Sequence, residues 1–236
     1  MDTEVTIDWS KYFDHIYCLH YLPDKARLPI ITKELDRVGI LKSGIFSFYW
    51  TFPSRFDTVI RNSVELKNVY FFNEHSSVVT NITYNNYRIV KESIGLDYDR
   101  ILILEDDVLF LHDLNKIKEL LDHIPSNWEF IQFDRCYKNN WFKLGPDNGY
   151  FMSDYIGGYT SSVCNGYGRR ALPRMASVLE QAFYLTDRFL VNTDIPEFSS
   201  LKKYLAMYNI VKQDDRGLDD GYHELLNFDD FYPRLD

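Results

Sequence analysis

Short apolar runs alternate along the chain with segments in which apolar residues recur at helical spacing. The runs predict β-strands over 15–20, 44–52, 68–72, 100–104, 128–133 and 159–168. The periodic segments predict helices over 24–38, 76–94, 113–123 and 169–183. Gly39 is the expected stop of the first helix, and the strand over 159–168 is expected to enter a glycine-containing turn. This alternation is typical of an α/β fold with a Rossmann-like, mostly parallel central sheet flanked by helices.

The most apolar strand, 100–104, is directly followed by the acidic triplet Glu105, Asp106 and Asp107. Four consecutive apolar residues predict a central strand that is covered on both faces. In open α/β sheets, ligands bind beyond the carboxyl ends of the strands. Three carboxylates at that place repel one another unless a cation is present, and hard oxygen ligands suit Mg²⁺ or Mn²⁺.

The spacing of the triplet makes a geometric prediction. If the extended backbone continues, Glu105 and Asp107 share one face and Asp106 points to the other. A divalent ion held by Glu105 and Asp107 would bridge a substrate diphosphate and stabilise it as a leaving group. The alternative, in which the acids cap the next helix and face water, stays open.

The net charge and the cysteine content argue against several classes of protein. The 236 residues include 26 basic and 35 acidic side chains, for a net charge of −9, which argues against a nucleic-acid binder. The three cysteines are widely spaced and lack a CxxC pair, which favours buried thiols over a disulfide framework or a zinc site. No run approaches the ~20 apolar residues of a membrane span, and no signal peptide is evident. We expect a cytoplasmic protein without an integral membrane segment, and peripheral attachment to the inner membrane stays open.

The run Ile101–Val108 closely resembles the LEDDV signature of glycosyltransferase family 25, the lipooligosaccharide-biosynthesis galactosyltransferase type. Other segments resemble blocks of that family in the same order. They are 15–20 with Asp24 and Arg27, 83–90, 159–172, 192–194 and 208–213. Asn85 and Asn86 stand where the family usually has a Ser-His pair. The resemblance covers about 14–215 and implies a single glycosyltransferase domain over 1–236, with the tail 216–236 as a lid or partly ordered end.

The resemblance implies a GT-A-like fold, a UDP-sugar donor such as UDP-galactose, and transfer with inversion to a glycan or glycolipid acceptor. It also implies Mn²⁺ or Mg²⁺, with Asp107 and either Glu105 or Asp106 contacting the metal and the diphosphate. An inverting transfer needs a carboxylate base. Asp194 is the first choice and Asp134 the second, with Asp154 third.

The donor nucleotide is expected near the carboxyl end of the first strand. His20, Tyr21 and Arg27 are the candidates there, because Tyr21 can stack on uracil and Arg27 can meet phosphate. Two alternatives stay open: a metal-dependent phosphoryl-transfer enzyme that uses the same acids, and a non-catalytic protein that binds nucleotide sugars.

Overall fold

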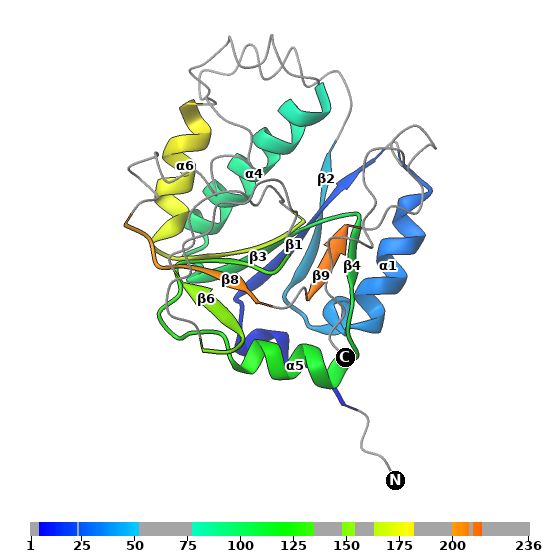
Figure 1. Cartoon of the computed structure of the whole chain (residues 1–236). Helices are drawn as coiled ribbons and strands as arrows, with labels where there is room; N and C mark the ends of the chain where they lie inside the picture. Colours follow the sequence, from blue (N-terminus) through cyan, green and yellow to red (C-terminus); the bar gives the residue numbers. More distant parts are fainter. Residues whose placement is uncertain are drawn as a thin grey trace, which may run out of the picture.

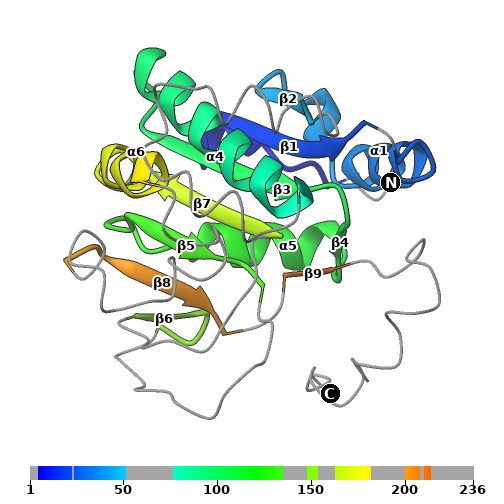
Figure 2. The same cartoon turned by 90° about the horizontal axis from the view of Figure 1, so that it is seen from above.

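A seven-stranded mixed sheet forms the centre of the computed structural model, in the order β2-β1-β3-β7-β5-β8-β6 (Figures 1 and 2). The structure describes residues 5–22, 24–51, 77–134, 148–153, 163–181, 200–207 and 210–213. The strands are β1 (His15–Tyr21), β2 (Phe46–Thr51), β3 (Arg100–Glu105), β5 (Phe130–Gln132), β6 (Phe151–Ser153), β7 (Cys164–Gly168) and β8 (Lys203–Ala206). β1, β2, β3, β5 and β8 run in one direction, and β7 and β6 run in the other. The predicted α/β class with a mostly parallel sheet is confirmed.

Helices cover both faces of this sheet (Figure 1). α1 (Arg27–Arg37) and α5 (Leu114–Asp122) pack on one face, and α4 (Ser77–Gly95) and α6 (Ala171–Gln181) pack on the other. Successive side chains of β1 point to opposite faces of the sheet. Ile16 and Cys18 therefore pack in the core under α1, whereas Tyr17 and Leu19 pack in the core under α4. The predicted helices are therefore confirmed, and their apolar stripes face the sheet. Within the described residues, no helix combines the length and the apolarity that crossing a bilayer requires.

The first helix ends as its sequence predicts. Ile31 and Leu35 are fully buried on the face of α1 that meets the sheet. Gly39 adopts a φ of 78°, a left-handed backbone conformation that glycine takes without steric cost. The chain then turns into β2, the parallel neighbour of β1.

A second, two-stranded sheet was not predicted. β4 (Val108–Phe110) begins directly after the acidic triplet and pairs antiparallel with β9 (Val211–Gln213). On the opposite edge of β4, the Phe110 amide donates to Glu34 at 2.7 Å, and Arg37 donates to the Phe110 carbonyl at 2.8 Å. Helix α1 therefore fixes the segment that follows the triplet.

The strand over 159–168 was expected to enter a glycine-containing turn, and this prediction was wrong. Gly166 and Gly168 lie within β7, and the turn follows at 169–170. A Cβ on Gly166 would lie 2.5 Å from Cγ2 of Ile131, and one on Gly168 would lie 3.2 Å from Cα of Glu129. These glycines allow β7 to approach the neighbouring segment closely, while running antiparallel between β3 and β5.

Two further predictions concern residues that the structure describes only in part. Cys18 and Cys164 are buried free thiols, as expected. The strand predicted over 68–72, Cys136 and the tail 216–236 lie outside the described residues.

Candidate functional site

The carboxyl ends of β1 and β3 form a topological switch point. β1 lies between β2 and β3, so the chain proceeds from β1 to one side of the sheet and later returns to the other. α1, which follows β1, lies on one face, and α4, which precedes β3, lies on the other. Open α/β sheets bind ligands in the crevice that such a reversal creates. The acidic triplet follows β3 at this edge.

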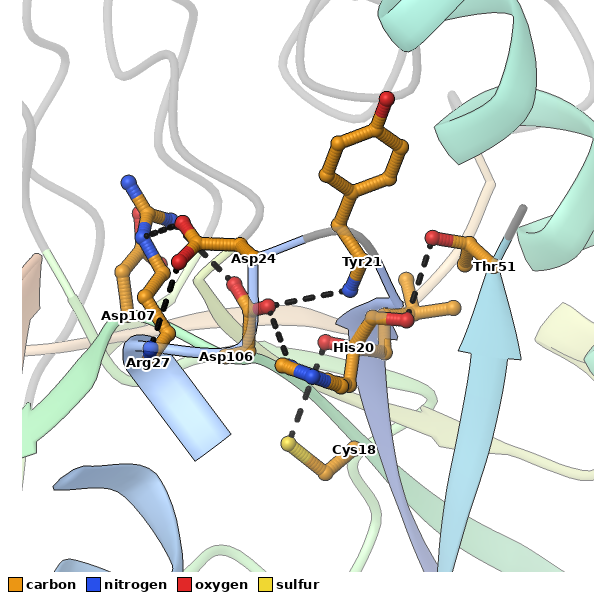
Figure 3. A network of polar contacts seen from close by, with 9 residues as sticks. Cys18, His20, Tyr21, Asp24, Arg27, Thr51, Asp106 and Asp107 are labelled. Carbon is orange, nitrogen blue, oxygen red and sulfur yellow. Dashed lines mark hydrogen bonds and ion pairs between the residues drawn. The ribbon is translucent and has the colours of Figure 1, made fainter. Parts of the chain in front are cut away.

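Asp106 is the centre of a polar network at the switch point (Figure 3). Its Oδ2 lies 2.7 Å from Nδ1 of His20 and accepts the backbone amide of Tyr21 at 3.0 Å. Its Oδ1 accepts from Nη1 of Arg27 at 3.3 Å. Asp106 and His20 are both buried. Both oxygens of Asp106 are therefore engaged by groups from β1 and α1, and the residue ties these elements to the end of β3.

Arg27 brings a positive charge into the acidic turn. Its Nε lies 2.9 Å from a carboxylate oxygen of Asp24, and its Nη1 lies 3.7 Å from Oδ2 of Asp107. Burial alone would lower the pKa of Arg27, but the charges of Asp107, Asp106 and Asp24 together raise it above its ordinary value. The guanidinium stays charged, and three carboxylates surround it.

The sequence predicted Glu105 and Asp107 on one face and Asp106 on the other, and only the opposition of Glu105 and Asp106 is observed. Leu104 packs under α1 and Ile103 under α4, so Glu105 falls on the α4 side and Asp106 on the α1 side. However, β3 ends at Glu105, and a turn follows at 106–107. The turn brings Asp107 to Arg27, on the side of Asp106, because the extended geometry does not continue.

Cys18 lies beneath this turn. Burial raises the pKa of the Cys18 thiol, and the charges of Asp106, Asp107 and Glu105 raise it further. The thiol is fully buried and stays protonated, so it serves as a small apolar group under the acidic edge.

Two residues at the end of β2 complete this edge and were not predicted. The hydroxyl of Thr51 donates to the carbonyl of His20 at 3.1 Å. The ring of Trp50 lies 5.4 Å from the ring of His20, edge to face. The sequence pointed to these two residues only through the aromatic run near the end of β2, and such a run is also typical of an ordinary buried strand. Tyr21, by contrast, contributes its backbone amide, and its ring projects away from the acidic residues (Figure 3).

Asp134 lies at the same edge, beyond β7. It follows β5 and is 3% exposed. The start of β7 separates it from the triplet, since Val163 accepts the amide of Glu105 at 2.9 Å and Cys164 accepts the amide of Phe133 at 3.1 Å. Two interstrand spacings correspond to about 9.5 Å between these strand ends. Burial raises the pKa of Cys164, and the Asp134 charge raises it further.

Other expected site residues fall elsewhere. Asp194 and Asp154 lie outside the described residues. Asn85 and Asn86, on α4, are both buried, so this pair is part of the interior under that helix.

The acidic turn offers a small set of donors for a metal ion. Within the described ranges, no group of three or more His, Cys, Asp or Glu side chains is arranged to hold a metal. Mg²⁺ is usually bound by one or two carboxylates together with substrate phosphates and water. Asp107 offers one such carboxylate, whereas Asp106 is engaged by protein donors and Glu105, the other predicted ligand, falls on the opposite side of the sheet.

Comparison with known proteins identifies no family. No family model matches the chain, and no curated protein matches its sequence. Among solved structures, the chain is similar to a glycosyltransferase involved in the glycosylation of the major capsid of PBCV-1, with 13% identity and a TM-score of 0.37. That match covers 70% of this chain and 65% of the other, so the chain spans less than two thirds of that protein.

Two further structures match over more of the chain. A197 from STIV has 12% identity and a TM-score of 0.40, over 84% of this chain and 83% of that one. Mannose-1-phosphate geranyltransferase from Thermus thermophilus has 11% identity and a TM-score of 0.40, over 85% of this chain and 75% of that one. At such scores the function has to be argued from the residues of the site.

Proposed function

We propose that the chain is a nucleotide-sugar-dependent glycosyltransferase, which moves a hexose from a UDP-sugar to a glycan or glycolipid acceptor. UDP-galactose is the expected donor. The observation that carries the proposal is the convergence of the acidic turn and Arg27 at the switch point of the sheet. This edge is where an open α/β sheet binds its ligand, and its charges suit a diphosphate held together with a cation.

The diphosphate would lie against Arg27 and the acidic turn. Asp24, Asp106 and Asp107 hold the guanidinium in place, so it needs no reordering when a phosphate arrives. Asp107 would hold Mn²⁺ or Mg²⁺ together with oxygens of the diphosphate and water. The ion supplies neutralisation of the charge that develops on the departing diphosphate. Asp106 positions His20 and Arg27 and is not assigned to the metal.

The acceptor hydroxyl must lose a proton as its oxygen bonds to the anomeric carbon and the bond from that carbon to the phosphate oxygen breaks. A carboxylate near the acceptor takes that proton. Of the two leading candidates, Asp134 lies at the same edge as the triplet, on the far side of β7. A base on the side away from the leaving group fits an inverting displacement. We assign this role to Asp134, with Asp194 as the competitor.

The two other hypotheses make different demands. Phosphoryl transfer with two metals needs additional carboxylates around a second ion about 3.5–4 Å from the first. Among the described residues, no larger cluster of metal-ligating side chains accompanies the triplet. A non-catalytic binding protein needs only the donor pocket, and turnover distinguishes it from an enzyme.

The test is release of nucleoside diphosphate from a panel of nucleotide sugars, with Mn²⁺ and with a chelator. We expect release from one donor, UDP-galactose first, which increases when a glycan acceptor is added. Binding of a donor without release would favour the non-catalytic hypothesis. Failure of folded protein to bind or to turn over any nucleotide sugar would overturn the proposal.

A further inference from the structure

Trp50 is an exposed aromatic residue on a strand whose other side chains are more buried. It is 40% exposed, whereas its neighbours on the same face of β2, Phe46 and Phe48, are partly buried and pack against the core under α1. Leu22, just after β1, is 39% exposed at the same edge. Large apolar side chains that are exposed beside a buried network of charged residues are typical of a surface that a ligand covers.

The indole of Trp50 packs against two neighbouring rings. Its ring lies 5.4 Å from the His20 ring at an interplanar angle of 82°, and 5.3 Å from the Phe48 ring at 34°. His20 is itself fixed by its 2.7 Å contact with Asp106. A ring that is already oriented loses little conformational entropy when a planar group stacks on it.

The position of Trp50 matches the length of a nucleotide. Trp50 is the register partner of His20, and Leu19 is the register partner of Glu105. Trp50 and the acidic turn are therefore two strands apart, about 9.5 Å, on the side of the sheet where His20 contacts both. A nucleoside diphosphate spans a comparable distance from its base to its terminal phosphate.

We propose that Trp50 is the platform on which the base of the donor nucleotide stacks, while the diphosphate lies at Arg27 and the acidic turn. The inference rests on the proposed function and adds the residue that selects a nucleotide over a bare diphosphate. The sequence suggested Tyr21 for stacking. Its side chain lies on the opposite face of β1 from His20 and points away from the acidic residues (Figure 3).

The experiment compares calorimetric titrations of UDP, GDP, ADP and inorganic pyrophosphate against wild type, Trp50→Ala and Trp50→Phe. Leu96→Ala is the matched control, because Leu96 is 54% exposed and lies after α4, outside the proposed site. For the nucleotide that wild type binds best, Trp50→Ala should weaken affinity about tenfold to a hundredfold, with pyrophosphate affected less than about twofold. Trp50→Phe should retain most of the affinity, and Leu96→Ala should bind as wild type does.

Fluorescence provides a second readout that does not depend on the stability of Trp50→Ala. Nucleotide should quench tryptophan emission of wild type, and Trp50→Phe should lose that quenching while calorimetry still shows binding. Equal nucleotide affinity in wild type and Trp50→Ala would overturn the inference. So would equal affinity of wild type for nucleotide and pyrophosphate, which would leave the diphosphate site intact. If wild type binds neither, the proposed function fails together with the inference.

Discussion

Nδ1 of His20 lies 2.7 Å from Oδ2 of Asp106, and this contact joins the carboxyl ends of two adjacent parallel strands. The same oxygen accepts the amide of Tyr21, and the other oxygen accepts from Arg27. One buried carboxylate therefore positions the end of β1, the first turn of α1 and the acidic turn relative to one another. Asp106 therefore maintains the site, which leaves Asp107 as the acid of this pair for the proposed cation and diphosphate.

Asp106→Asn should be the most destabilising change in the triplet. Asparagine keeps the shape but removes the charge that His20 and Arg27 face, and removing one partner of a buried pair costs about 3 kcal/mol. Urea unfolding measures the loss. Asp36→Asn is the matched control, since Asp36 pairs with Lys42 at the surface and should change the free energy of unfolding by less than about 1 kcal/mol. Equal stability of the two variants would show that the network does not hold the site together.

Asp134→Asn should reduce turnover without weakening donor binding. If Asp134 removes the acceptor proton, kcat should fall about a hundredfold or more, while donor affinity stays near wild type. Steady-state kinetics with saturating acceptor separates the two effects. Asp194→Asn is the companion variant, and a loss of kcat there with unchanged kcat in Asp134→Asn would transfer the role of base to Asp194.

Gly166→Ala should destabilise the sheet by about 2 kcal/mol, because its Cβ would lie 2.5 Å from Ile131 and 3.3 Å from Trp128. Gly95→Ala is the control: a Cβ there has no neighbour within 4 Å, and alanine favours the helix. We expect Gly95→Ala to be neutral or slightly stabilising. Thermal unfolding of both variants checks the prediction, and an unchanged melting temperature in Gly166→Ala would contradict it.

His15 should make stability depend on pH on the acidic side of neutrality. Its ring stacks on Tyr98 at 5.4 Å, and burial lowers its pKa, with Glu92 partly opposing the shift. A folded pKa below the unfolded value of about 6.5 means that its contribution is complete above that pH and is lost as pH falls through the folded pKa. Urea midpoints measured from pH ~8 down to ~5 should fall, and His15→Gln should reduce that slope. An identical slope in the variant would assign the effect to other groups.

The sequence predicted the long elements and the apolar strand β5, but not the short strands β4, β6, β8 and β9. β1, β3 and α1 have enough apolar residues at regular spacing to show their period. β4 and β9 have three residues each, too few for a period, and they exist because each supplies the other's hydrogen bonds. The direction of β7 was not predictable, because it depends on which strands it meets.

The sequence predicted where the site residues lie in the fold better than it predicted what each of them does. The triplet after β3 and the residues His20 and Arg27 near β1 were each expected at the donor nucleotide, and the structure brings them into contact with one another. Which acid faces inward depends on the turn at 106–107, which no spacing rule encodes. Trp50 was missed because an aromatic residue in a strand normally packs in the core, and only its exposure distinguishes it.

Asp107→Asn tests the central claim most directly, through calorimetric titration of UDP in the presence of Mn²⁺. We expect wild type to bind, and the variant to lose at least about tenfold in affinity because a carboxylate that holds the cation and diphosphate is gone. Its free energy of unfolding is measured on the same samples, because Asp107 is buried beside Arg27 and only a folded variant tests binding. Undiminished UDP binding by Asp107→Asn, or no binding by folded wild type, would contradict the account.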